Sequence, residues 1–174
     1  YSAVLQLEVL GLGQQRLMEP ILDVGCGPKA ALVRFLVGGG QEVQGIDRDV
    51  ESDAELPVGT LSAEDWLTFP FDKDRWGTIV SHLGFSLHFL HFHFGQDALA
   101  YDFAKVYMAM LKSLRVGGVF AYAPALPFME ALLPAATYRC ETLLLPPELA
   151  KMAPPVQKEA ATALGRASHV RRLA

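Results

Sequence analysis

Four residues near the start of the chain have the types and the spacing of a nucleoside-binding site. Asp23, Gly25 and Gly27 stand at alternate positions after a short apolar run, and Asp47 ends the next apolar run. Glycines let a backbone pass close beneath a ligand, where a Cβ atom would collide. A carboxylate at the end of a second strand can accept hydrogen bonds from both hydroxyls of a ribose. Together these residues define a nucleoside site without naming the nucleoside.

The carboxylate of Asp23 narrows the choice of ligand. A dinucleotide carries two phosphates, which an acidic side chain two residues ahead of the first glycine would repel. S-adenosylmethionine has no phosphate and carries an ammonium and a sulfonium, which a nearby carboxylate favours. The third glycine of the dinucleotide fingerprint is displaced in the run 25–30, and no Gly-Lys-Ser/Thr run is present to hold a triphosphate. The residues therefore favour S-adenosylmethionine over NAD or a nucleoside triphosphate.

The elements that would position these residues alternate between strand and helix patterns. We predict strands at residues 21–24, 42–46, 58–61, 76–81 and 119–123. We predict helices within residues 5–18 and at 30–36 and 97–114, followed by helix 126–136, strand 138–145, helical pieces in 148–164 and strand 168–173. This alternation predicts an α/β fold, a Rossmann-like doubly wound and mostly parallel sheet with helices on both faces. Ligands of such sheets bind at the carboxyl ends of the strands.

Composition limits the size and the class of the protein. The chain has 174 residues, of which 51% are hydrophobic and 20% charged, so it suffices for one domain over residues 1–174 and not for two. The net charge of −4 disfavours a strong binder of polyanions. The only cysteines, Cys26 and Cys140, have no metal-ligand spacing, and no apolar run reaches membrane-spanning length. Residues 1–10 lack the pattern of a signal peptide. We therefore expect a cytoplasmic protein with no membrane contact and no metal site.

Five segments resemble, in order and spacing, the motifs of the class I S-adenosylmethionine-dependent methyltransferases. They are residues 22–28 for the first motif, 45–47 for the acidic second motif, 62–66 for the third motif, 75–81 for the fourth strand and 111–120 for the helix, turn and strand after it. The resemblance covers about residues 17–123, which contain the core motifs. It implies a methyltransferase that uses S-adenosylmethionine as its cofactor.

The resemblance also implies roles for single residues. Asp23, Gly25 and Gly27 would line the methionine end of the cofactor, with Asp47 on the ribose and Arg48 beside the adenine. Cys26, between the two glycines, is included in the predicted site as a small packing residue of the turn.

The third motif departs from the family at the adenine. Ser62 stands where many relatives have an acidic residue that bonds the adenine amino group. Ala63 and Glu64 follow it, and Glu64 is the acidic side chain that could substitute. Ser81 and His82 would close the methionine side at the end of the fourth strand.

The methyl acceptor is less well defined, because methyl transfer from a sulfonium needs mainly alignment and only sometimes a base. The sequence has Ser81-His82-Leu83-Gly84 where enzymes acting on exocyclic amines of nucleic acid bases usually carry an Asn/Asp-Pro-Pro-aromatic run. We therefore expect a small-molecule acceptor, with protein or RNA left open. His82 and His88 are the candidate bases, and the segment 85–94, rich in Phe and His, is expected to form a substrate wall or lid rather than a metal site. A non-catalytic S-adenosylmethionine-binding module or partner subunit is the alternative, and the oligomeric state is left open.

Overall fold

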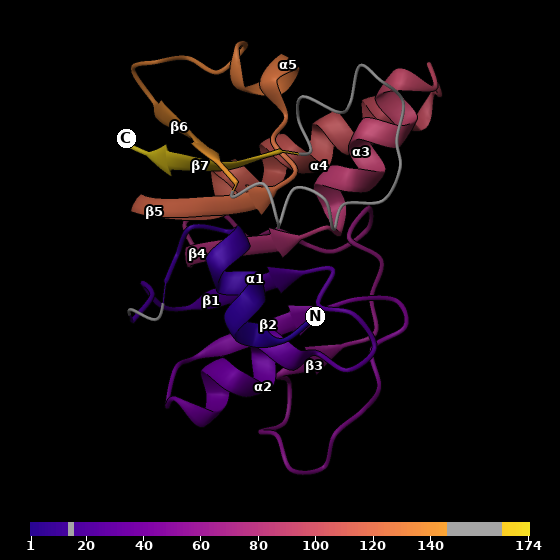
Figure 1. Cartoon of the computed structure of the whole chain (residues 1–174), viewed down its shortest axis with the longest axis vertical. Coiled ribbons are helices and arrows are strands. Elements are labelled where there is room, and N and C mark those ends of the chain that lie inside the picture. The colour runs from indigo at the N-terminus through magenta and orange to yellow at the C-terminus, as the bar shows by residue number, and fades with distance from the viewer. Residues whose placement is uncertain (14–15, 146–164) are drawn as a thin grey trace.

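The computed structural model describes residues 1–13, 16–145 and 165–174. Within them, seven strands form one sheet in the order β3-β2-β1-β4-β5-β7-β6 (Figure 1). The strands are β1 Ile21–Val24, β2 Val43–Ile46, β3 Leu61–Ser62, β4 Trp76–His82, β5 Leu114–Ala123, β6 Tyr138–Leu144 and β7 Arg166–Arg172. The neighbours among β1 to β5 pair in parallel, whereas β7 pairs antiparallel with both β5 and β6.

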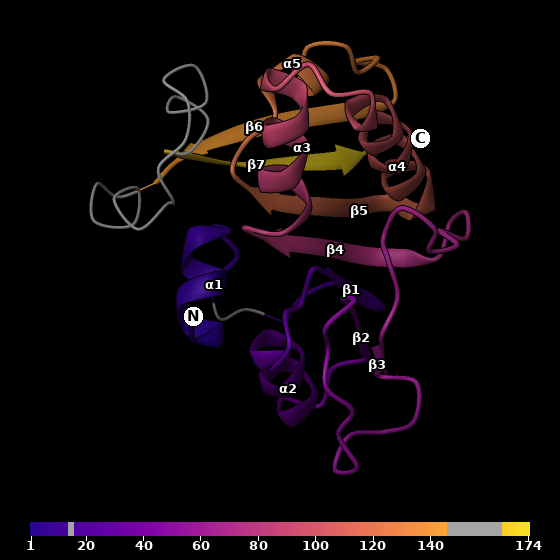
Figure 2. The same cartoon turned by 90° about the vertical axis from the view of Figure 1, so that its right-hand side faces the viewer.

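Helices cover both faces of this sheet. They are α1 Ala3–Val9, α2 Ala31–Gly38, α3 Phe85–Phe94, α4 Leu99–Ser113 and α5 Pro127–Glu130. Helices α1 and α2 lie on one face, and α3, α4 and α5 lie on the other (Figures 1 and 2). The predicted Rossmann-like α/β fold is therefore confirmed. In the part of the chain that the structure describes, no helix has the length and apolarity needed to cross a membrane.

The central strand β1 is buried along its whole length, which explains its short apolar sequence. It pairs with β2 on one side and with β4 on the other. Leu22 and Val24 join the core beneath α3 and α4, while Ile21 joins the core beneath α1 and α2. Side chains alternate along a strand, so Asp23 points toward the same face as Ile21. A charged side chain in such a strand is costly unless it has a function or a partner.

An aromatic cluster fixes α3 and α4 on the sheet. The rings of Phe85, Phe89 and Phe103 lie with centroids 5.2 to 5.9 Å apart, and all three side chains are buried. The segment 85–94, predicted as a substrate wall or lid, thus forms helix α3 with part of its aromatic side chains in the core.

The structure differs from the predicted elements at β3, β5 and α5, and the helical pattern predicted within residues 5–18 forms, among the described residues, only α1, which ends at Val9. The turn closed by the bond from Thr60 N–H to the Pro57 carbonyl delays β3 until residue 61. Strand β5 begins at residue 114 instead of 119, because an irregular register between Trp76 and Thr78 lets it pair earlier with β4. Helix α5 spans four residues, and Pro134, which cannot continue a helix, follows it closely. The helical pieces predicted in 148–164 lie outside the described residues.

Candidate functional site

The turn after β1 lies against the carboxyl end of β2. The N–H of Gly25 donates a hydrogen bond to the carbonyl of Ile46 at 2.9 Å, and the N–H of Gly27 donates to Oδ2 of Asp47 at 3.0 Å. Both glycines have positive backbone φ angles, 80° and 73°, which residues with a Cβ atom rarely adopt. Gly25, Gly27 and Asp47, three of the residues predicted to bind the cofactor, therefore meet at the carboxyl ends of β1 and β2.

Gly25 has no room for a side chain. A Cβ atom there would lie 3.2 Å from the Cα of Gly84 and 3.2 Å from the indole of Trp66. Trp66 itself packs against Phe85 and His88, with ring centroids 6.5 and 5.6 Å away. On the α3 side, the turn is thus closely covered by an indole and by the beginning of a helix.

Asp23 is a buried carboxylate without a partner. Its side chain belongs to a residue with 1% exposure, and Oδ2 accepts no hydrogen bond from any described residue. Burial, and secondarily the charge of Asp47, raises the pKa of Asp23 from 3.8 to about 7. A buried anion without a partner is unfavourable by itself and becomes favourable when a cation or a hydrogen-bond donor lies beside it.

A cavity of about 400 Å³ lies on the α1 side of the turn. It is lined by Tyr1 and Gln6 at α1, by residues 25–31 of the turn and of α2, and by His82 at the end of β4. No side chain among the described residues caps the first N–H groups of α2, so these donors can serve a ligand. The cavity therefore joins the glycine turn, free backbone donors and one imidazole.

His82 is the candidate base that lines this cavity. Its ring meets the ring of Tyr1 edge-on, with centroids 5.0 Å apart. Burial lowers the pKa of His82 from 6.5 to about 4, so the imidazole is neutral at physiological pH and can accept a proton or a hydrogen bond. His88 lies farther away, on the exposed surface of α3 beside Trp66, where lost hydration and the positive charge of Arg48 lower its pKa.

Ser81 is engaged in the fold. Its hydroxyl donates to the carbonyl of Val24 at 2.8 Å and accepts from the N–H of Phe85 at 3.1 Å. The residue is fully buried. It therefore joins the ends of β1 and β4 to the first turn of α3, directly beneath the candidate site.

Cys26 also points into the protein. Its Sγ lies 3.0 Å from the position that a Cβ of Gly45 would occupy, so it packs between the turn and β2. Burial raises the pKa of this thiol. The side chain of Cys26 is thus a packing group between the turn and β2.

The residues predicted to lie beside the adenine follow the carboxyl ends of β2 and β3. Arg48 is exposed, with its guanidinium 3.9 Å from the carboxylate of Asp65. The hydroxyl of Ser62 accepts a hydrogen bond from the side chain of Gln44 at 3.2 Å. Ala63 and Glu64 are exposed in the loop after β3. None of these four residues lines the cavity beside the glycine turn.

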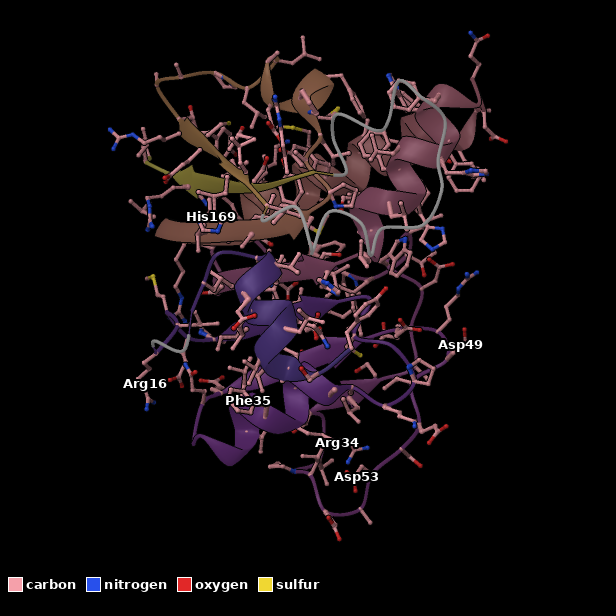
Figure 3. All side chains as sticks on the ribbon, in the orientation of Figure 1. Arg16, Arg34, Phe35, Asp49, Asp53 and His169 are labelled. Atoms are coloured by element: carbon pink, nitrogen blue, oxygen red, sulfur yellow. The ribbon has the colours of Figure 1, made fainter. Side chains whose placement is uncertain are left out.

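One ion pair and one backbone hydrogen bond hold the loop that carries Asp47. Figure 3 shows Arg34 of α2 beside Asp53, with which it forms an ion pair, and the same guanidinium donates to the carbonyl of Lys29 at 2.8 Å. The N–H of Asp49 donates to Oδ1 of Asp47 at 3.0 Å. Both carboxylate oxygens of Asp47 are therefore oriented by backbone donors.

Residues that the sequence did not single out also form the site. Tyr1 and Gln6 come from the segment before β1, and Trp66 is the last residue of the third motif, for which no role at the site was predicted. Their residue types carry no signal of ligand binding. Only the packing of α1 and of the 62–66 loop against the turn brings them there.

Comparison with known proteins identifies the fold. A TehB-like S-adenosylmethionine-dependent methyltransferase from Corynebacterium glutamicum matches with a TM-score of 0.56 and 16% identity, over 99% of this chain and 87% of its own. The plantazolicin methyltransferase BpumL, solved with S-adenosylhomocysteine, matches with a TM-score of 0.56 and 14% identity, over 98% and 82%. An rRNA methylase from Streptococcus thermophilus matches with a TM-score of 0.55 and 12% identity, over 99% and 94%. The chain therefore has the Rossmann-like fold of the class I S-adenosylmethionine-dependent methyltransferases.

The other comparisons set limits on this result. Two further methyltransferase structures are matched over only 44% and 48% of their own length, so the chain spans less than half of those proteins. No protein-family model matches the chain, and no curated protein matches it in sequence.

Proposed function

We propose that this chain is an S-adenosylmethionine-dependent methyltransferase that acts on a small molecule. The observation that carries the proposal is the buried carboxylate of Asp23 beside the glycine turn, whose Oδ2 has no hydrogen-bond partner among the described residues. S-adenosylmethionine carries an ammonium and a sulfonium, and their positive charge would compensate this anion. The residues present therefore fit the cofactor.

Each predicted residue has a defined task in this proposal. Asp23 attracts the positively charged methionine end, while the turn at Gly25 and Gly27 lets the cofactor lie against the backbone. Asp47, already oriented by two backbone donors, accepts hydrogen bonds from the ribose hydroxyls. Arg48 and the loop that begins at Ser62 border the adenine.

The bound cofactor supplies an activated methyl group on a sulfonium. The protein then has to hold the acceptor in line with that group and exclude water, which accounts for most of the catalysis expected here. His82 lines the same cavity as Gly25 and is neutral at physiological pH, so it can orient an acceptor hydroxyl or amine and take up its proton. A pKa near 4 makes His82 a weak base, which suits positioning better than deprotonation of an unactivated acceptor.

A small-molecule acceptor is supported by the run that follows β4. Ser81-His82-Leu83-Gly84 offers no aromatic clamp for a nucleic acid base, and its serine is used inside the fold. Proteins with the same fold act on acceptors as different as rRNA and plantazolicin, so the fold by itself does not select one. The two cysteines are free, which agrees with a proposed cytoplasmic location.

The test measures binding first and turnover second. Calorimetry with S-adenosylmethionine, S-adenosylhomocysteine and NAD should give micromolar binding of the first two, about −8 kcal/mol, and much weaker binding of NAD. Release of S-adenosylhomocysteine is then measured against small molecules, peptides and RNA. Tighter binding of NAD would refute the proposal. Cofactor binding with no turnover on any acceptor would favour the alternative function, a non-catalytic cofactor-binding module or partner subunit.

A further inference from the structure

The edge strand β6 has backbone groups that no described residue satisfies. Figure 2 shows β6 at the border of the sheet, beyond β7. The ladder continues past both ends of the strand through bonds from Leu145 N–H to the Gly165 carbonyl and from Leu173 N–H to the Thr137 carbonyl. Antiparallel hydrogen bonds involve alternate residues, so the odd-numbered residues of β6 bond to β7 and the even-numbered ones point outward.

From Cys140 to Leu144, the outward N–H groups of β6 have no partner among the described residues, but that of Tyr138 has one. The N–H of Tyr138 already donates to the carbonyl of Pro134 at 3.0 Å. The N–H groups of Cys140, Thr142 and Leu144 have no partner within the described residues, and all three side chains are exposed, Leu144 by 78%. This half of β6 has no proline, lysine or bulge, which are devices that protect an edge strand, and Glu141 is its one charged side chain.

We propose that this edge pairs, antiparallel, with the same edge of a second copy of the chain, about a two-fold axis at Thr142. In that register, Cys140, Thr142 and Leu144 face Leu144, Thr142 and Cys140 of the second copy, so every free outward group finds a partner. The exposed side chain of Leu144 is then covered by Cys140 of the second copy, and the two Thr142 side chains face each other.

Charge and sterics disfavour the registers centred at Cys140 and at Glu141. An axis at Leu143 or Leu144 would leave the outward groups of Cys140 without a partner in β6 of the second copy. An axis at Glu141 would set two carboxylates directly opposite each other, which is unfavourable. An axis at either Cys140 or Glu141 would also bring the second strand opposite Tyr138, where the carbonyl of Pro134 already occupies the outer edge. The axis at Thr142 avoids these conflicts. Five residues per copy form a small interface, so the dimer should be weak and concentration-dependent.

Cysteine cross-linking reports the register. In Leu144→Cys, the new thiol faces Cys140 of the second copy at a Cα separation of about 5.5 Å, within the range of a disulfide. Mild oxidation with diamide should therefore link Leu144→Cys into a covalent dimer. Wild type should stay unlinked, because its two Cys140 residues lie about 14 Å apart in this register. The variant Leu144→Cys/Cys140→Ser should also stay unlinked. A covalent dimer of wild type would overturn the register.

Sedimentation equilibrium from micromolar to millimolar concentration measures the association itself. Thr142→Arg places two cations at the axis and should weaken the dimer about fivefold or more. Thr142→Pro removes an outward donor and spares the bonds to β7, so it should abolish association. Leu144→Ser removes the exposed apolar side chain from the interface and should weaken the dimer. Leu132→Ser, which removes a leucine exposed by 77% outside the strand, is its matched control and should associate as wild type does. The proposal is wrong if wild type stays monomeric throughout or if Thr142→Arg associates as wild type does. It is independent of methyl transfer.

Discussion

Replacing Asp23 by Asn should stabilise the protein and weaken its binding of the cofactor. The folded-state pKa of Asp23, about 7, lies above the ordinary value of 3.8, so the folded chain holds this proton more tightly than the unfolded chain does. The ionised carboxylate therefore destabilises the fold progressively as the pH rises from about 4 through 7. Asn has nearly the same shape and no charge, so it removes this penalty.

The magnitude follows from the same values. A rise of the pKa from 3.8 to about 7 corresponds to about 4 kcal/mol of unfavourable burial at a pH well above 7. The amide of Asn leaves a buried polar group unpaired in turn, which costs about 1–3 kcal/mol. We therefore expect Asp23→Asn to stabilise the cofactor-free protein by about 1–3 kcal/mol at about pH 8.5, and to have little or unfavourable effect at about pH 5.

The effect on cofactor affinity has the opposite sign. The variant loses a charged partner for the ammonium, worth about 1.5–3 kcal/mol, which is about 10- to 100-fold in the dissociation constant. In wild type, affinity should increase as the pH rises through 7, because Asp23 becomes ionised, whereas in the variant it should change little.

Urea denaturation and calorimetry at the two pH values measure both effects. Asp49→Asn is the matched control, since Asp49 is an exposed carboxylate two residues beyond Asp47. It should leave cofactor affinity within about threefold, under roughly 0.7 kcal/mol. The reasoning is refuted if Asp23→Asn fails to stabilise the cofactor-free protein at the higher pH, or if it binds the cofactor as tightly as wild type.

Three further substitutions test other parts of the site. Asp47→Ala should cost about 2–3 kcal/mol of cofactor affinity, and about 1 kcal/mol of stability through the lost bond to Gly27, measured by calorimetry and urea titration. An unchanged dissociation constant would place the ribose elsewhere. Ser81→Ala leaves the carbonyl of Val24 without its donor and should destabilise the fold by about 1–3 kcal/mol in the same titration, and equal stability would argue against this bond. His88→Ala, at an exposed position outside the cavity that His82 lines, should preserve stability, cofactor affinity and the rate of methyl transfer, and a lowered rate would place the acceptor on the α3 side of the turn instead.

Much of the fold could be predicted from the sequence because its signals are local. The run 21–24 reads as a buried strand, and the glycines after it read as a tight turn, from residue types alone. The apolar stripe of 97–114 predicted α4 within two residues of its ends. Strands β3 and β5 were placed less well, because their limits depend on pairing with neighbours that are distant in the chain.

The sequence also located Asp23, Gly25, Gly27 and Asp47 at one edge of the sheet, since parallel strands bring their carboxyl ends together. The hydrogen-bond partners of their side chains could not be predicted from the sequence. Nothing in the local sequence says that one oxygen of Asp23 is without a partner, or that the oxygens of Asp47 already accept backbone donors. Those facts depend on which groups surround each carboxylate after the chain has folded.

Tertiary packing alone decided which predicted residues remain available to a ligand. Ser81 donates a hydrogen bond to Val24, a residue 57 positions earlier. Trp66 covers Gly25, which lies 41 positions earlier in the chain. His82 lines a cavity to which Tyr1 and Gln6, from the beginning of the chain, also contribute. Hydrophobic periodicity and the residue preferences of turns depend on a few neighbouring residues, so they can be recognised in the sequence. Burial, hydrogen-bond partners and pKa values arise from contacts between segments far apart, and only the folded chain determines them.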